Sequence, residues 1–204
     1  MSDFMLEKHC WAEIDLDALR HNFAFIKRTV NGPVCAVVKA DAYGHGDVTV
    51  ARVLQQEGAA AFAVSCLSEA KHLRRHGITL PILILGYTDP SQAAVLADQD
   101  IITACFSTEY AKALSEAAVA AGVRVKVHLK VDTGMGRIGF AARSDWQAVV
   151  KELEALYALP GLSICGIFQH FAVADSVKPD AQDYTDSQYA LFRQVVDRLQ
   201  ADGY

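Results

Sequence analysis

The residue with the clearest chemical potential is Lys39, which follows an apolar run in the segment VCAVVKADAYGHG. Short runs rich in β-branched residues favour a buried strand, here residues 34–38. The strand must end soon after, because turn-forming residues follow it at Asp41, Gly44 and Gly46. Partial burial at a strand end lowers the pKa of a lysine and favours the free amine that forms Schiff bases. A packed lysine whose ammonium reaches water fits the same place, so the segment alone leaves both roles open.

A second informative segment, VKVHLKVDTGMGRIGF, covers residues 125–140. Alternation along a strand gives it an apolar and a polar face. The apolar face holds Val125, Val127, Leu129 and Val131, and the polar face holds Lys126, His128, Lys130 and Asp132. In a barrel the polar face points inward, so Lys130 and Asp132 lie near the mouth where barrel active sites are built. An edge strand with a solvated polar face is the alternative.

Three glycines follow this strand and surround Arg137. Gly134, Gly136 and Gly139 leave room for a turn or a ligand, and an arginine among them can bind an anionic oxygen. Their spacing matches neither a dinucleotide-binding nor a P-loop fingerprint. The tripeptide DTG also occurs in aspartic proteases, but one copy in a chain with α/β periodicity does not supply paired carboxylates.

Histidines give weaker signals. His170 ends the apolar run of the expected sixth strand, and a structural role is the ordinary one for a lone histidine. Its place at the carboxyl end of a barrel strand favours a functional role instead. His72 and His76 share a helix face without a carboxylate or cysteine in register, so we expect a solvated face and no metal site.

Two periodicities alternate along the chain and predict its fold. Strands are expected at 34–38, 61–65, 81–86, 101–106, 123–131 and 163–170. Helices are expected at 15–30, 47–56, 68–76, 91–97, 109–121, 146–157 and 183–201. This order predicts an α/β fold, a (β/α)8 TIM-type barrel truncated after about six βα units. We expect an N-terminal strand segment over 1–14, strand-like at 10–14, then a barrel domain over 15–204, with 172–180 as its most mobile loop.

Composition excludes several classes of protein. Hydrophobic residues make up 52% and charged residues 21% of the 204, as in an ordinary globular protein. The net charge of −5, without a basic stripe, argues against nucleic acid as a partner. No apolar run reaches the roughly 18 residues of a membrane helix, and the first residues lack the apolar core of a signal peptide. Five scattered cysteines without a CxxC pair indicate a reducing, cytoplasmic compartment.

The segments VVKADAYGHG, KVDTGMGRIGF and HFAVAD occur in this order and together resemble the motifs of alanine racemases, barrel enzymes that depend on pyridoxal 5'-phosphate (PLP). The resemblance runs from about Trp11 to the end of the chain. It implies that Lys39 forms the Schiff base with PLP and acts as a catalytic base, and that Tyr43 reaches the cofactor phosphate. PLP serves as the electron sink, and the protein supplies orientation and charge.

The same resemblance assigns roles to three further residues. Arg137 is similar to the arginine that contacts the phenolic oxygen of the cofactor and the carboxylate of the substrate. His170 would lie against the pyridine ring. Lys130 resembles a family lysine that is often carbamylated. No metal is implied.

The implied activity is conversion of L-alanine to D-alanine for peptidoglycan precursors, by a homodimeric parent enzyme. Racemisation needs proton-transfer groups on both faces of a planar carbon, and Lys39 serves one of them. The family's opposing base is a tyrosine on a C-terminal β domain, which this chain lacks, so we expect the chain alone to be inactive. The alternatives are a racemase for serine or another small amino acid, and a non-catalytic PLP-binding barrel protein.

Overall fold

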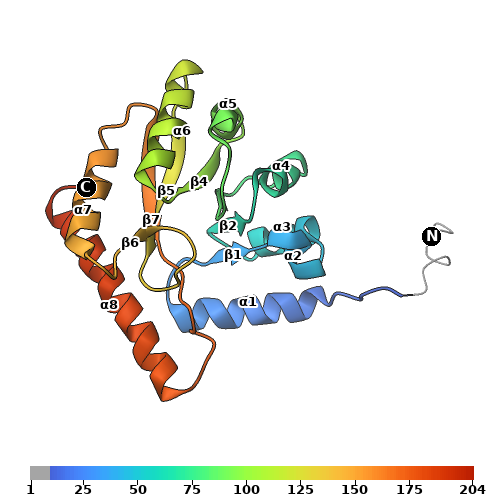
Figure 1. The fold of residues 1–204 in the computed structure, drawn as a ribbon. Coiled ribbons are helices and arrows are strands. Elements are labelled where there is room, and N and C mark those ends of the chain that lie inside the picture. Colours follow the sequence, from blue (N-terminus) through green and yellow to red (C-terminus); the bar gives the residue numbers. More distant parts are fainter. Residues whose placement is uncertain (1–9) are drawn as a thin grey trace. The chain divides into compact units, whose positions relative to one another are not determined.

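The computed structural model describes residues 10–204, whose contacts divide them into two compact units. The N-terminal unit ends at Ile82, and the C-terminal unit begins at Leu83. Both units alternate strands with helices (Figure 1), as the sequence pattern predicts. The strand pairs within each unit are parallel. The prediction of an α/β fold is therefore confirmed. Along residues 10–204, no helix combines the length and the apolar character needed to cross a membrane.

The N-terminal unit is built on one parallel strand pair, β1 with β2. Its elements are α1 (Leu16–Val30), β1 (Cys35–Val37), α2 (Lys39–Gly44), α3 (Asp47–Gln56), β2 (Ala61–Val64) and α4 (Leu67–Arg75). Helix α1 begins where the Asp15 carboxylate accepts hydrogen bonds from the amides of Asp17 and Ala18, both at 2.9 Å. It ends at Asn31, which adopts the left-handed conformation common at helix ends.

Two expectations for this unit are wrong. Residues 10–14, expected as a strand, have no regular secondary structure and belong to none of the paired strands in the described part of the chain. The remainder of that expected segment, 1–9, lies outside the described residues. The apolar run before Lys39 is also less buried than expected: Val38 is buried, whereas Cys35 and Val37 are exposed. Among the described residues, β1 has a single partner strand and so is covered on one side only.

The short element α2 is a left-handed turn that the sequence does not predict. Four consecutive residues, 40–43, have φ values of 52°, 55°, 50° and 56°. For residues other than glycine this conformation costs roughly 1–2 kcal/mol each, because the Cβ atom crowds the following carbonyl oxygen. The surrounding contacts must therefore hold the turn in place.

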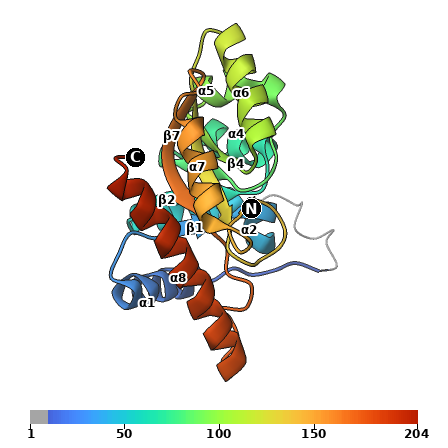
Figure 2. The same ribbon diagram turned by 60° about the vertical axis from the view of Figure 1, so that its left-hand side comes forward.

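The C-terminal unit is centred on β5, which pairs with three other strands. Its elements are β3 (Ile82–Ile84, the first residue counted with the other unit), η2 (Pro90–Gln92), α5 (Ala93–Asp98), β4 (Ile101–Cys105), α6 (Thr108–Ala120), β5 (Val125–Asp132), β6 (Phe140–Ala141), α7 (Trp146–Leu156), β7 (Leu162–Phe168) and α8 (Pro179–Ala201). Strand β5 lies between β4 and β7 and also pairs with the two-residue β6. Helices α7 and α8 lie side by side (Figures 1 and 2).

Strand β5 confirms the predicted alternation. The valines and the leucine of its apolar face, at 125, 127, 129 and 131, are all fully buried. On the opposite face, Lys126 is exposed and pairs with Asp100 at 2.6 Å, whereas Lys130 is buried. The register shifts between Val127 and His128 where β5 meets β7.

The start of α8 differs from the sequence expectation. The helix begins at Pro179 instead of residue 183, so the stretch expected as a loop over 172–180 already ends in helix. Proline suits the first position of a helix, because its missing N–H would have no partner there and its φ angle is already helical. Pro179 therefore belongs to the first turn of α8 and not to the loop before it.

Candidate active site

Lys39 and Tyr43 lie together at the carboxyl end of β1. Lys39 is half-buried and follows Val38, and its Nζ atom lies 5.9 Å from the centroid of the Tyr43 ring. The Tyr43 side chain is 62% exposed. The prediction that Lys39 stands at a strand end is confirmed. The left-handed turn therefore brings the amine of Lys39 close to the solvent-exposed phenol of Tyr43.

Glu69 anchors this turn and was not identified from the sequence. Its Oε1 accepts a hydrogen bond from the Ala40 amide at 2.8 Å, and its Oε2 accepts bonds from the Ser65 amide at 2.7 Å and hydroxyl at 2.8 Å. Burial acts to raise the pKa of the Glu69 carboxyl, but these hydrogen bonds outweigh it and the pKa is lowered. A glutamate in the first turn of a helix signals capping, and that signal was available from the sequence.

Lys130 is the buried cation of the C-terminal unit. It is 3% exposed, its Nζ donates to the carbonyl of Val131 at 3.0 Å, and the same atom lies 5.5 Å from the centroid of the Phe168 ring. Burial lowers the pKa of Lys130 to about 8; Arg137 adds to this effect, and Asp132 opposes it. A substantial fraction of this amine is therefore neutral in mildly alkaline solution.

Asp132 organises the glycine-rich turn that carries Arg137. Its carboxylate accepts hydrogen bonds from the amide of Gly134 at 2.9 Å and from the amide of Gly136 at 2.9 and 3.1 Å. Burial acts to raise the pKa of Asp132, but these amides and the charge of Lys130 lower it overall. The turn leaves Arg137 exposed, where its guanidinium can meet an anion.

A second support for this turn comes from α8. The Tyr184 hydroxyl donates to the carbonyl of Gly134 at 2.7 Å and accepts from Nη1 of Arg143 at 2.5 Å. The Arg143 guanidinium carbon lies 4.8 Å from the centre of the Tyr184 ring. No motif in the sequence pointed to either residue, because Tyr184 lies outside the apolar face of its helix and Arg143 lies in the turn between β6 and α7.

His170 lies two residues beyond the end of β7, which stops at Phe168 and not at His170 as expected. Its carbonyl accepts a hydrogen bond from Nε2 of Gln188 at 3.2 Å, and the same nitrogen lies 3.2 Å from the Thr133 hydroxyl. Gln188 is fully buried. The backbone after β7 is thus tied to the residue after Asp132 through one side chain of α8.

The His72 and His76 rings lie with their centroids 4.4 Å apart and their planes tilted by 51°. A carboxylate that the sequence did not place there comes from the preceding helix, α3: Oδ1 of Asp47 lies 3.6 Å from Nε2 of His72. Within residues 10–204, no three histidine, cysteine, aspartate or glutamate side chains form a group suited to a metal ion.

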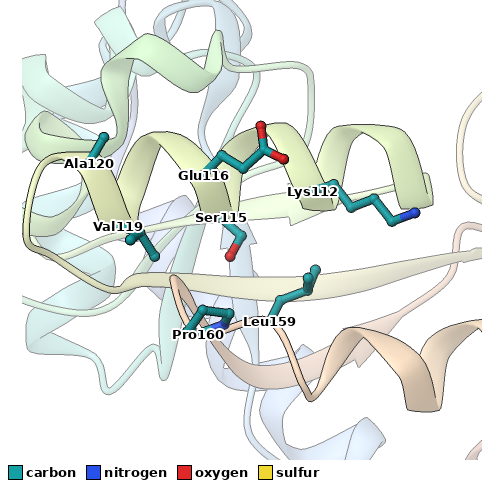
Figure 3. A pocket seen from close by; sticks show the side chains of 7 residues that line it. All are labelled: Lys112, Ser115, Glu116, Val119, Ala120, Leu159 and Pro160. Carbon is teal, nitrogen blue, oxygen red and sulfur yellow. The ribbon is translucent and has the colours of Figure 1, made fainter.

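A surface hollow of the C-terminal unit lies along α6 and holds none of the predicted site residues (Figure 3). Its volume is about 400 Å³, and it is lined by Lys112, Ser115, Glu116, Val119, Ala120, Leu159 and Pro160. Most of this lining is aliphatic. The hollow is therefore separate from Lys130 and Arg137, the predicted site residues of this unit.

The predicted site residues thus form two groups. Lys39 and Tyr43 come together in the N-terminal unit, and Lys130 and Arg137 come together in the C-terminal unit with the backbone of His170 tethered nearby through Gln188.

Comparison with known proteins gives a consistent result. A family model described as "Alanine racemase, N-terminal domain" matches residues 14–204. The alanine racemase of Desulfosudis oleivorans is 44% identical over 211 aligned residues, which cover 100% of this chain and 52% of the relative. The chain spans about half the length of the curated relatives it matches.

Solved structures agree with this match. The alanine racemase of Clostridium difficile 630 aligns with a TM-score of 0.86 and 39% identity, covering 95% of this chain and 50% of that chain. A histidine racemase from Leuconostoc mesenteroides aligns with a TM-score of 0.78 and 35% identity, covering 87% and 46%. The prediction of a barrel-type α/β fold is confirmed, and the described strands correspond to part of such a barrel.

Proposed function

The chain belongs to the alanine racemase family, and on that premise we propose that it forms the PLP-binding part of an enzyme that interconverts L-alanine and D-alanine. The observation that carries the proposal is Lys39, an accessible amine held on a strained turn at the end of a strand. Strain of this kind collects at functional sites, where the surrounding contacts hold it. Residues 15–204 are proposed as one barrel domain.

The side chains suit PLP by their chemistry. The cofactor carries an aldehyde, a phosphate and a phenolic oxygen, and when bound it withdraws electrons from the α-carbon of an amino acid. Lys39 offers the amine for the aldehyde, and Tyr43 presents a hydroxyl for the phosphate beside it. Arg137 is proposed to bind the phenolic oxygen and the substrate carboxylate, and His170 to pack against the ring. The exposure of Arg137 on an ordered turn supports its role.

Lys39 is proposed to move the α-proton of alanine on one face of the substrate. Inversion needs a second group on the opposite face, since a base cannot return the proton from a side that it does not reach. Lys39 is the one base that we assign in this chain. We therefore propose that the 204 residues alone exchange the α-proton without racemising alanine.

This proposal predicts an asymmetric exchange reaction. In D2O with PLP, the chain is expected to replace the α-proton of one alanine enantiomer at least about 10²-fold faster than PLP does by itself. Inversion to the other enantiomer should be much slower than this exchange. Proton NMR follows the exchange, and chiral chromatography follows the inversion. The control is PLP with heat-denatured chain.

Two results would contradict the proposal: exchange no faster than in the control, or inversion as fast as exchange. Serine and histidine are tested beside alanine, because racemisation of another amino acid is the second candidate function. The histidine racemase among the structural relatives supports that candidate. If the α-proton of histidine or serine exchanges faster than that of alanine, the result favours this second candidate function. A PLP-binding barrel without turnover would bind the cofactor and exchange nothing.

We further propose that Lys130 carries a carbamate. Its neutral amine attacks the carbon of CO2, an N–C bond forms as one C=O π bond opens to place its electron pair on oxygen, and one proton leaves the nitrogen for water. The lowered pKa of Lys130 supports the reaction, since the neutral form is the reactive one. The product is an anion, which would pair with the nearby Arg137 where an ammonium would be repelled. Neutralisation by Asp132 without modification is the competing explanation.

Isotope labelling tests the carbamate. At constant dissolved CO2, a ¹³C carbamate signal should appear after addition of ¹³C-labelled bicarbonate and grow as the pH rises through the pKa of about 8. The signal should grow with pH because the Lys130 amine is protonated below that pKa and neutral, and so reactive, above it. Lys130→Arg should remove the signal, and Lys126→Arg, a change in the exposed lysine of the same strand face, should keep it. A bare ammonium at Lys130 with no carbamate signal would favour Asp132 as the neutralising group.

The cellular context follows from the same family membership. We propose a cytoplasmic location, which the five free cysteines support. The parent enzyme is proposed to be a homodimer that supplies D-alanine for peptidoglycan.

A further inference from the structure

The left-handed turn after Lys39 is held at its two ends by different carboxylates. At the far end, Oδ1 of Asp41 accepts a hydrogen bond from the Asp47 amide at 2.9 Å, and the Asp41 carbonyl accepts one from the Gly46 amide at 2.9 Å. At the near end, Oε1 of Glu69 accepts the hydrogen bond of the Ala40 amide at 2.8 Å. Ala40 directly follows Lys39, so this bond fixes the peptide group attached to the lysine.

Part of the role of Glu69 is ordinary helix capping. It lies in the first turn of α4, and its Oε2 accepts bonds from the Ser65 amide and hydroxyl just before that helix. The bond from Ala40 is not part of any cap, because Ala40 is 29 residues away in the sequence. One carboxylate therefore joins the end of β2, the start of α4 and the residue after Lys39.

The geometry explains why a carboxylate is required. Four donors converge on the Glu69 carboxylate: the Ala40 amide on Oε1, the Ser65 amide and hydroxyl on Oε2, and the Cys66 amide. An ionised carboxylate accepts at both oxygens, whereas the amide of glutamine accepts at one and donates at the other. The single oxygen of glutamine satisfies more donors on the Ser65 side than on the Ala40 side, so its NH2 group is expected to face the Ala40 amide, where it cannot accept the hydrogen bond.

We propose that Glu69 is a positioning residue, which acts through the Ala40 amide to hold the strained turn and so orients the amine of Lys39 beside Tyr43. Glu69 touches neither the lysine amine nor the phenol in the interactions described above. The inference deepens the proposed function and rests on the assignment of Lys39 as the cofactor lysine. The bond between Glu69 and Ala40 can be tested independently of that assignment.

The test uses Glu69→Gln and the matched variant Ser65→Ala in the 204-residue chain. Ser65→Ala removes one hydrogen bond to the same carboxylate but keeps the bond from Ala40. The first readout is hydrogen exchange of the Ala40 amide, followed by NMR. The second readout is the rate at which PLP becomes fixed to Lys39, measured by borohydride quenching at successive times and peptide mass spectrometry.

Glu69→Gln is expected to speed exchange at Ala40 about tenfold or more and to slow labelling of Lys39 by a similar factor, because a bond to a charged acceptor is lost. Ser65→Ala should change both rates much less. Unchanged exchange at Ala40 in Glu69→Gln would overturn the proposal. Faster exchange with unchanged labelling would also overturn it, since Glu69 would then be a capping residue alone.

Two further results are also decisive. If the unaltered chain takes no label at Lys39, the proposed function fails, and the positioning role fails with it, although exchange at Ala40 still shows whether the carboxylate holds the turn. If Glu69→Gln does not fold, Glu69→Asp replaces it, because the shorter carboxylate keeps the charge and loses the reach to Ala40. If Glu69→Asp shows the same Ala40 amide exchange and the same rate of Lys39 labelling as the unaltered chain, the proposal is overturned.

Discussion

Replacing Lys39 with alanine should reduce α-proton exchange of alanine by about 10²- to 10⁴-fold, the usual contribution of a positioned general base. The amine of Lys39 is the base that we assign to one face of the substrate, and its removal leaves that face without a proton acceptor. The side chain is half-buried beside Tyr43, so its removal creates no large cavity in the core. We therefore expect the variant to fold, with a thermal midpoint close to that of the unaltered chain.

Chemical rescue makes this prediction specific. A small amine such as methylamine should restore part of the exchange in Lys39→Ala, because it can occupy the space of the missing side chain and accept the proton. Lys71→Ala, which removes a lysine from α4 in the same unit, serves as the control and should exchange normally. Exchange in Lys39→Ala at the rate of the unaltered chain would contradict the assignment of the base.

Gly139→Ala should lower the free energy of unfolding by about 3 kcal/mol or more, because two costs combine at this position. The φ angle of Gly139 is +128°, where an L-residue is strained. A Cβ atom there would also lie 2.8 Å from the carbonyl oxygen of Lys130 and 2.9 Å from the amide nitrogen of Asp132. Both neighbours are backbone atoms of β5, so relief requires a shift of the strand itself.

Gly136→Ala is the matched control in the same turn. Its φ angle is +70°, but a Cβ atom would meet no other atom within 4 Å. Only the backbone strain remains, and we expect a loss of about 1 kcal/mol. Urea unfolding followed by circular dichroism measures both variants. Equal losses in the two would contradict the close contact between Gly139 and β5.

The sequence predicted β5 well because its two faces differ in polarity at every step. The valines and the leucine of the apolar face are buried as expected, and Lys130 and Asp132 come together at the end of the strand. The position of Lys39 was predicted for a similar reason, since an apolar run and the turn residues after it limit where a strand can end. Both the two faces of β5 and the position of Lys39 are thus determined by residues that are close together in the sequence.

The left-handed turn could not be predicted in this way. Alanine and tyrosine favour right-handed conformations, and the segment ADAY carries no glycine at the four strained positions. Its conformation depends on Glu69, which is distant in the sequence, and tertiary contacts of this kind leave no periodic signal. The roles of Tyr184 and Gln188 could not be predicted for the same reason. Both residues lie in α8, but their hydrogen bonds are made to Gly134 and Thr133 in the turn after β5.

The proposal that this chain binds PLP through Lys39 is tested most directly by mapping the covalent attachment. The chain is incubated with PLP, reduced with borohydride, digested and examined by mass spectrometry. We predict a pyridoxyl group on Lys39 in most of the molecules, with little on the exposed lysine Lys126. A label on other lysines with Lys39 unmodified would contradict the account.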